Sequence, residues 1–367
     1  MLVVVLDTNA VHSDPWLASP PGKKLLDLAA SGSCVVVYPQ VVIDELLRQR
    51  REAADRAHSE AAKGVGDMAK SGVDVRQTIA DLEASFAGIG ADLLSAFGAV
   101  LKRDNVTAEP VPDVAATEIL KRDLARRRPF IEIDFKQKPA SVGFRDTLIW
   151  ETVLAILARD NERKILFVTA DKGFLSVDSK TLHQHLLEDL DERGIGRNRV
   201  GSVKNVPHAI AEVEAADHAA LVTAATDALY ELADREISQQ MGYGGDYDYP
   251  DFVKFEVPAM EGGSISYIDQ TTEFEFARQP GSVAVTATAD ALIYIEGPVF
   301  KGDWFIDGGE SMSLSGELND HYFEASSEIA VRVVVELDTS GDSPQALSIQ
   351  LEDLPSSSSG SEETETA

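Results

Sequence analysis

The first part of the chain contains short continuous apolar runs, the pattern typical of strands that are buried on both faces of a sheet. The runs cover residues 2–6, 34–38 and 165–168, and a last short strand is expected near residue 200. Helical patterns lie between them, and residues 65–128 read as largely helical. Strands that alternate with helices in this way favour an α/β domain with a mainly parallel sheet.

The pattern changes in the second part of the chain. Residues 207–240 are rich in alanine and read as one long helical tract, and residues 241–250 form a hinge of Gly, Tyr and Asp. Further on, apolar and polar residues alternate, as at Val331, Val333 and Val335. This alternation predicts about six half-buried strands in a small antiparallel sheet or sandwich.

Four segments follow from these patterns. They are an α/β domain (1–205), a helical linker with a hinge (206–245), an acidic antiparallel β domain (246–354) and a disordered acidic tail (355–367). The formal net charge of −29 is divided unevenly, with −2 in residues 1–205 and −27 in residues 206–367. The second part would repel a polyanion, so we expect nucleic-acid contacts in the first. A saline cytoplasm is an alternative reason for the acidity.

The cysteine and the apolar runs indicate a cellular setting. Cys34, the single cysteine, lies in an apolar run and is expected to be a small core residue, since it has no partner for an intrachain disulfide. The N-terminal run is too short for a membrane span and lacks a basic leader. The sequence therefore favours a cytoplasmic protein that does not associate with membranes.

Acidic residues stand where strands end or helices begin in the first domain: Asp7, Glu45, Asp146 and Asp171. Such positions can converge at the carboxyl edge of a sheet. Carboxylates gathered in one pocket repel each other unless a cation lies among them, and oxygen ligands select Mg²⁺ or Mn²⁺. The alternative is that these acids are separate caps and surface groups, and Asp7 in particular is of a type that caps helices and turns.

Glu45 has an acidic neighbour with which it can be confused. Asp44 points about 100° away from Glu45 around the helix. Val41 and Val42 lie one turn before Glu45 and place it on the side that faces the sheet. We therefore assign Glu45, rather than Asp44, to the acidic cluster.

Two arginines are candidates for contacting the phosphates of a nucleic acid. Arg145 directly precedes Asp146, and Arg48 lies on the helix that carries Glu45. Cations at the mouth of an acidic pocket can bind phosphate oxygens. The other basic clusters are expected to be solvated helix faces that pair with neighbouring acids. Trp150 is expected in the core.

The segments around the four acids resemble those of the PIN-domain nucleases. The resemblance covers roughly residues 1–205 and depends on the stretches VVVLDTN, PQVVIDELLRQ, GFRDTLIWE and FVTADKGF. The long insertion between the second and third acids is similar to that of the larger PIN variants. The resemblance implies a central parallel sheet flanked by helices and metal-dependent cleavage of single-stranded RNA.

The resemblance also implies roles for the acids. Asp7 and Asp146 would bind Mg²⁺ or Mn²⁺ directly, whereas Glu45 and Asp171 would bind through water or orient the attacking water. All four would thus be catalytic and metal-binding residues. Such an ion activates water for the in-line displacement at a phosphate.

Two neighbouring residues would support the acids. Thr169 would hydrogen-bond the carboxylates and fix their geometry, and Asn9 would do the same. The chain departs from the family at Gly173, where many relatives carry a further acid after Asp171. This departure puts a second metal site in doubt but not the fold.

The sequence thus predicts a hydrolase, a metal-dependent endoribonuclease, and many PIN nucleases have toxin or defence roles. A catalytically inactive PIN scaffold that binds RNA or protein is the alternative. A HAD-type phosphatase ranks lower, because Asn9 stands where its second acid is needed. The β domain is expected to bind a protein partner, an antitoxin included, or to shield the site. The oligomeric state stays open, with a homodimer among the options.

Overall fold

The computed structural model describes residues 2–135, 138–178, 180–240, 260, 264–279, 282–305, 312–341 and 343–354. The chain divides into two units, Met1–Asp217 and His218–Ala367. The expected hinge at 241–250 and the expected tail at 355–367 lie outside the described residues.

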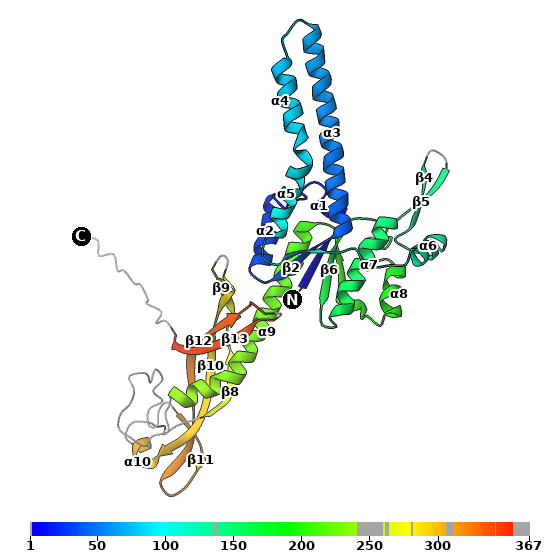
Figure 1. The fold of residues 1–367 in the computed structure, drawn as a ribbon. Coiled ribbons are helices and arrows are strands. Elements are labelled where there is room, and N and C mark those ends of the chain that lie inside the picture. Colours follow the sequence, from blue (N-terminus) through cyan, green and yellow to red (C-terminus); the bar gives the residue numbers. More distant parts are fainter. Residues whose placement is uncertain are drawn as a thin grey trace, which may run out of the picture. The chain divides into compact units, whose positions relative to one another are not determined.

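The N-terminal unit is built on a five-stranded parallel sheet with the strand order β3-β2-β1-β6-β7 (Figure 1). Central β1 pairs on both sides, so that Val4 lies opposite Val36 of β2 and Leu166 of β6. The sheet confirms the predicted α/β class. Its strands are β1 (Leu2–Leu6), β2 (Cys34–Pro39), β3 (Val106–Glu109), β6 (Lys164–Val168) and β7 (Val200–Val203).

Helices flank this sheet, and most of them begin directly after a strand or a short loop (Figure 1). Their bounds are α1 (Thr8–Val11), α2 (Pro20–Ala30), α3 (Gln40–Lys70), α4 (Arg76–Ala87), α5 (Ile89–Leu101), α6 (Ala116–Leu124), α7 (Phe144–Arg159), α8 (Gln184–Glu192) and the 3-10 turn η1 (Arg197–Arg199).

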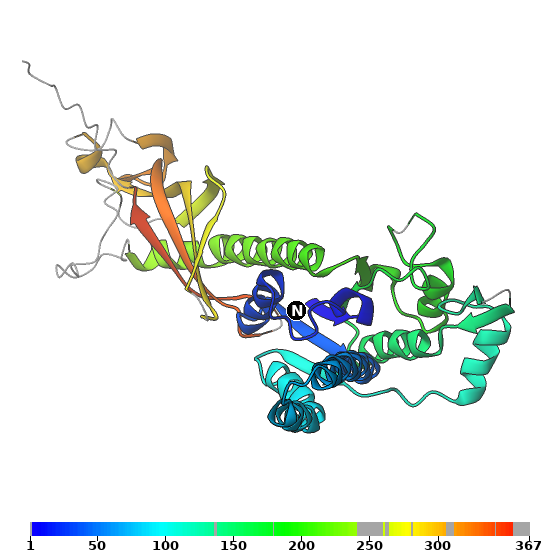
Figure 2. The same ribbon diagram turned by 90° about the horizontal axis from the view of Figure 1, so that it is seen from above.

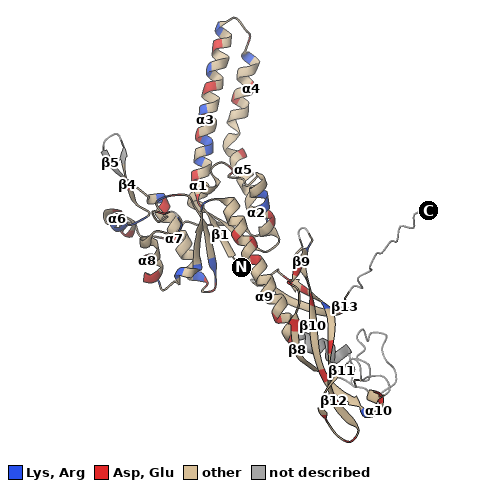
Figure 3. Cartoon of the chain, turned by 180° about the vertical axis from the view of Figure 1, so that it is seen from behind, with Lys and Arg blue, Asp and Glu red and all other residues tan. Residues whose placement is uncertain are grey.

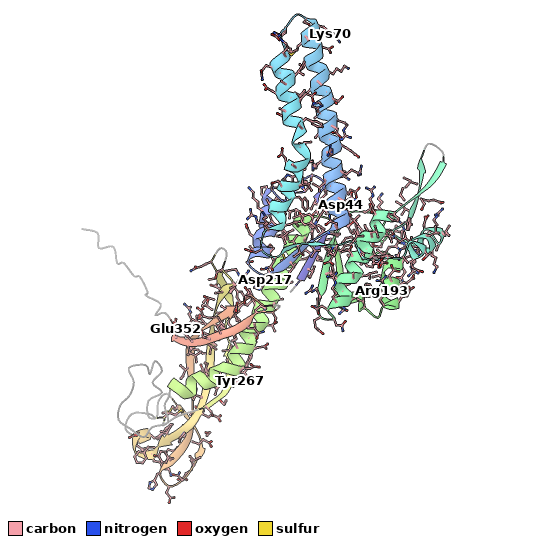
Figure 4. All side chains as sticks on the ribbon, viewed as in Figure 1. Asp44, Lys70, Arg193, Asp217, Tyr267 and Glu352 are labelled. Carbon is pink, nitrogen blue, oxygen red and sulfur yellow. The ribbon has the colours of Figure 1, made fainter. Side chains whose placement is uncertain are left out.

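Helices α3 and α4 stand away from the sheet as a helical hairpin, which Figure 2 shows almost end-on. Only the first turns of α3 are buried, from Val41 to Leu46. Figure 4 labels Asp44 at this end of α3 and Lys70 at the opposite end. In the described part of the chain, no single helix is long and apolar enough to cross a membrane, although α4 and α5, bent by 44°, would pass that test as a pair.

The core of the N-terminal unit explains why its strands are continuous apolar runs. Val4, Leu6 and Phe167 are fully buried, and so is Trp150 of α7. Burial of a large apolar side chain contributes about 1.5–3 kcal/mol. Cys34 is also fully buried, and burial raises the pKa of its thiol to about 12. The predictions of core positions for Trp150 and Cys34 are therefore confirmed.

Two short elements differ from the sequence prediction. Strand β3 lies within the stretch predicted as helical, and only Val106 of its residues is buried, so no apolar run marks it. The second is a two-stranded antiparallel hairpin of β4 (Ile131–Phe135) and β5 (Lys138–Val142), in a region where the apolar runs predict no strand.

The C-terminal unit contains a six-stranded antiparallel sheet, as predicted. Its long strands β10 and β12 pair without interruption from Ala284 opposite Asp338 to Phe300 opposite Tyr322. The elements are β8 (Ser264–Gln270), β9 (Glu275–Arg278), β10 (Ala284–Phe300), α10 (Lys301–Asp303), β11 (Met312–Glu317), β12 (Tyr322–Asp338) and β13 (Gln345–Asp353).

Helix α9 (Val206–Gln240) occupies the segment that the sequence predicts as a linker. Val206 and Val213 belong to the core of the N-terminal unit, and Leu221 and Leu229 belong to the core of the C-terminal unit. The division between the units thus falls inside one helix, which contributes apolar side chains to both cores. Figure 3 shows that Asp and Glu greatly outnumber Lys and Arg on the described strands of the C-terminal sheet.

Candidate active site

Asp7 lies at the carboxyl end of the central strand β1, where the backbone leaves the sheet. Its amide still donates to the carbonyl of Val168, and its backbone occupies the N-cap position of α1. The carboxylate does not cap that helix; it accepts a 2.7 Å hydrogen bond from the Thr169 hydroxyl. The side chain is thus directed along the sheet edge rather than back onto its own helix.

The surroundings of Asp7 disfavour its negative charge. The residue is 2% exposed, and burial raises the pKa of its carboxyl to about 7. The Thr169 hydroxyl opposes this rise, whereas the charges of Asp146 and Asp171 add to it. The three aspartates are therefore close enough to repel one another.

Asp146 enters the cluster from the first turn of α7. The pKa of its carboxyl is raised to about 6, chiefly by burial and also by the charges of Asp171 and Glu45, while Arg145 opposes the rise. The N-cap residue of this helix is Gly143, whose φ of 138° favours glycine. A Cβ there would lie 2.7 Å from the Cα of Phe130, so the close packing at this turn also requires glycine.

Asp171 follows β6 and is held by hydrogen bonds on both carboxylate oxygens. Gly173 donates its amide to Oδ1 at 2.6 Å, and Asn9 donates its side-chain amide to Oδ2 at 3.1 Å. Thr169 accepts from the Asp171 amide at 3.1 Å while it donates to Asp7. The two predicted supporting residues, Thr169 and Asn9, thus both hydrogen-bond acids of the cluster.

The structure gives a physical reason for the glycine at position 173. A Cβ there would lie 3.0 Å from Oδ1 of Asp171 and 3.0 Å from the carbonyl oxygen of Pro129. Both distances are shorter than ordinary contacts. A second acid at Gly173 would therefore crowd the Asp171 carboxylate and add a negative charge beside it.

Glu45 reaches the cluster from the second turn of α3, with its side chain 13% exposed. It accepts from the Thr8 hydroxyl at 3.1 Å and from the Gln49 side-chain amide at 3.2 Å. Arg145 forms an ion pair with the same carboxylate. Asp44 is instead exposed and accepts from Gln40 at 2.8 Å, so the two neighbouring acids point to different surroundings.

Sequence reasoning missed Thr8 and Gln49. Thr8 stands between Asp7 and Asn9, and Gln49 follows Glu45 by one helical turn. Spacing alone could have suggested Gln49, since residues four apart are neighbours on a helix. The contact of Thr8 with Glu45 depends on how α1 and α3 are placed, and the sequence carries no local signal for it.

Both arginines expected at a nucleic-acid interface lie at Glu45. Arg145 pairs with it directly, and Nη2 of Arg48 lies 3.8 Å from its Oε1. Arg48 pairs more closely with Glu52.

A second group of basic residues serves the structure of the domain. Arg122 and Arg127 bind the carboxylate of Asp189, whose side chain is 6% exposed. Trp150 donates its indole N–H to the same carboxylate at 2.8 Å. The expected pairing with acids is confirmed, but the expected solvated face is wrong for Arg122, whose side chain is 11% exposed and pairs with a buried acid 67 residues away.

The donor chemistry of the cluster fits a hard divalent cation. Its carboxylates offer only oxygen ligands, and burial together with the neighbouring acids disfavours the charged forms of Asp7 and Asp146, which a cation would stabilise. Among the described residues, no three His, Cys, Asp or Glu side chains are placed to hold an ion as they stand. Closure around an ion would require side-chain rotation, and Glu45 would have to loosen its pairing with Arg145.

Comparison with known proteins finds a family match over the part of the chain that contains the acidic cluster. A family model described as PIN domain matches residues 4–174. The match begins in β1 and ends at Phe174, so it spans all four acids of the cluster. No curated protein and no solved structure matches the chain.

Proposed function

The chain carries a PIN domain, a fold that is generally that of nucleases, and on this premise we propose that it is a Mg²⁺- or Mn²⁺-dependent endoribonuclease that cleaves single-stranded RNA. The observation that carries the proposal is the placement of Asp7, Asp146 and Asp171 at the carboxyl edge of the parallel sheet, close enough for their charges to act on one another. Buried acids that raise one another's pKa destabilise a domain, and they cluster in functional sites.

In this proposal the four acids have different roles in binding the cation. Asp7 is buried at the end of β1, Asp146 lies in the first turn of α7, and these two acids would hold the cation directly. Asp171 and Glu45 would complete its surroundings through water. When bound, the cation would supply a water activated for attack and would stabilise charge on the phosphate oxygens.

The supporting side chains would keep the carboxylates oriented. Thr169 holds Asp7, and Asn9 holds Asp171, each through one hydrogen bond. Such hydrogen bonds hold the carboxylates in place before the cation binds, so that less conformational freedom is lost on binding. The side chains of Arg145 and Arg48 are about half exposed, and their guanidinium groups would bind phosphate oxygens of the RNA.

An inactive PIN scaffold is the second candidate. It is favoured by the carboxylates' failure to converge on one point among the described residues. The preserved supports of Asp7 and Asp171 count against it, because a scaffold has no need for repelling buried acids. A toxin or defence role, an antitoxin and a protein partner for the acidic β domain remain predictions from the sequence.

The test is cleavage of a labelled single-stranded RNA with Mg²⁺ or Mn²⁺. We expect EDTA to abolish cleavage and Asp7→Asn to reduce it by about 100-fold or more, because a direct ligand is lost. Asp44→Asn is the matched control, since this neighbouring acid is exposed and contacts only Gln40 among the described hydrogen bonds. Undiminished cleavage by Asp7→Asn, or cleavage in EDTA, would contradict the proposal.

A further inference from the structure

Arg145 places a fixed positive charge inside the acidic cluster. Its Nη1 donates to Oε1 of Glu45, and its charge also acts on Asp146, the next residue along α7. The guanidinium therefore faces two of the acids that would surround a divalent cation. It provides part of the neutralisation that the cation would otherwise supply.

The Glu45 carboxylate is fully engaged in this arrangement. Oε1 accepts from both Arg145 and Gln49, and Oε2 accepts from the hydroxyl of Thr8. For Glu45 to turn toward a cation, or toward a water bound to one, a partner must leave. Thr8 is 7% exposed and Gln49 lies on the same helix as Glu45, whereas the Arg145 side chain is 54% exposed.

We infer that Arg145 is an internal counter-cation that competes with the divalent metal for Glu45 and leaves it when the metal binds. This inference rests on the proposed metal-dependent function. Arg145 is a positioning residue here, because it acts on the metal through Glu45. Competition between two cations for one carboxylate weakens the binding of each.

The release of Arg145 would link the metal to the RNA. A guanidinium freed from Glu45 remains beside Asp146 and exposed to solvent, and its planar fork suits phosphate oxygens. In the metal-bound domain, the Arg145 guanidinium would then be available to RNA, whereas in the metal-free domain it is paired with Glu45. Removal of Arg145 should therefore have opposite effects on the two ligands, tightening metal binding and weakening RNA binding.

The test is the affinity of the full chain for Mn²⁺, measured from the signal of free Mn²⁺ in electron paramagnetic resonance. We expect Arg145→Ala to bind Mn²⁺ about twofold to fivefold more tightly than the wild type, the upper part of the range typical of one lost exposed ion pair. Arg145→Gln removes the charge but keeps hydrogen-bonding capacity, and it should shift the affinity in the same direction.

Arg159→Ala is the matched control. Arg159 lies on the same helix and pairs with Glu109, with side chains 57% and 13% exposed, compared with 54% and 13% for Arg145 and Glu45. This variant removes the same charge from α7 without touching the acidic cluster. Its Mn²⁺ affinity should equal that of the wild type.

The outcomes separate this inference from the proposed function. If the wild type binds Mn²⁺ and neither Arg145 variant binds it more tightly than Arg159→Ala, the inference is wrong and the nuclease proposal stands. If the wild type does not bind Mn²⁺, both are wrong. A rise in the KM for RNA of Arg145→Gln at saturating Mn²⁺, with tighter metal binding, would support the release of Arg145 toward phosphate.

Discussion

A single hydroxyl organises two acids of the cluster. Thr169 is fully buried, and its side chain donates to Asp7 while it accepts from the amide of Asp171. Its own amide donates to the carbonyl of Val203 in β7, so the residue is fixed by the sheet as well. The positions of Asp7 and Asp171 therefore depend on each other through one side chain.

Replacement of this hydroxyl tests its role. Thr169→Val keeps the shape of the side chain but removes the hydroxyl that donates to Asp7, so we expect metal affinity and RNA cleavage to fall about 10- to 100-fold. Thr152→Val is the control, because Thr152 is also buried and its hydroxyl binds only the Leu148 carbonyl on the same helix among the described hydrogen bonds. Equal behaviour of the two variants would show that Thr169 has no special role.

The raised pKa values predict how stability depends on pH when metal is removed. The pKa of Asp7 rises from 3.8 to about 7, and that of Asp146 rises from 3.8 to about 6, so folding favours the protonated forms. Their contribution is fully present below pH 3.8 and is lost as the pH rises through about 6 to 7. The metal-free protein should therefore lose stability over this range.

Urea denaturation in EDTA, at several pH values, measures this loss. We expect the free energy of unfolding of the wild type to fall more steeply with pH than that of Asp7→Asn, because the amide does not titrate. The slopes of the two free energies against pH should differ by up to about 1.4 kcal/mol per pH unit where Asp7 is ionised in the unfolded state but protonated in the folded state. Parallel curves for the two proteins would contradict the assigned surroundings of Asp7.

At this scale the sequence predicts the acids better than their partners. Asp7 and Asp171 follow apolar strands, and Glu45 lies on the inward face of a helix, so each has a local signal. The pairing of Arg145 with Glu45 has none, because the two residues are 100 positions apart. Such a contact depends on the packing of α3 and α7, which the local pattern does not specify.

At the scale of elements, the start of α7 is the most constrained point near the site. Gly143 has a φ of 138°, and it sets where α7 begins and hence where Asp146 points. Thr147 donates both its amide and its hydroxyl to the Gly143 carbonyl and so reinforces this turn.

A substitution at this turn should disturb both the fold and the site. We expect Gly143→Ala to lower the free energy of unfolding by about 1–3 kcal/mol, since alanine tolerates this backbone poorly and its Cβ would meet Phe130. Gly98→Ala, inside α5, is the control: its Cβ meets nothing within 4 Å, and alanine favours a helix. Urea denaturation should show a lower free energy of unfolding for Gly143→Ala and a higher one for Gly98→Ala than for the wild type. Changes of the same sign in both variants would contradict the argument.

Elements with strong patterns were predictable, and weak ones were not. The buried strands β1, β2 and β6 are uninterrupted apolar runs and were predicted from them. Strand β3 has four residues and one buried side chain, and it belongs to the sheet because β2 offers it an edge. The double role of α9 also escapes the pattern, because a helix that packs on two cores has no single apolar stripe.

At the scale of the whole chain, the candidate active site and most of the net negative charge lie in different parts of the sequence. The clustered acids lie in the N-terminal unit, and the segment 206–367 carries a net charge of −27. Such a charge disfavours RNA binding by the C-terminal unit. We therefore expect the metal and the RNA phosphates to be bound by the N-terminal unit alone.

The most direct test of the central claim is the anomalous scattering of Mn²⁺ in crystals of the full chain. We predict a strong Mn²⁺ peak at the carboxyl edge of the parallel sheet, with oxygens of Asp7 and Asp146 at 2.0–2.3 Å, roughly the distances of such ligands. Asp7→Asn crystals should lose the peak, and Asp44→Asn crystals should keep it. Strong Mn²⁺ peaks elsewhere, with none between these carboxylates, would contradict the account.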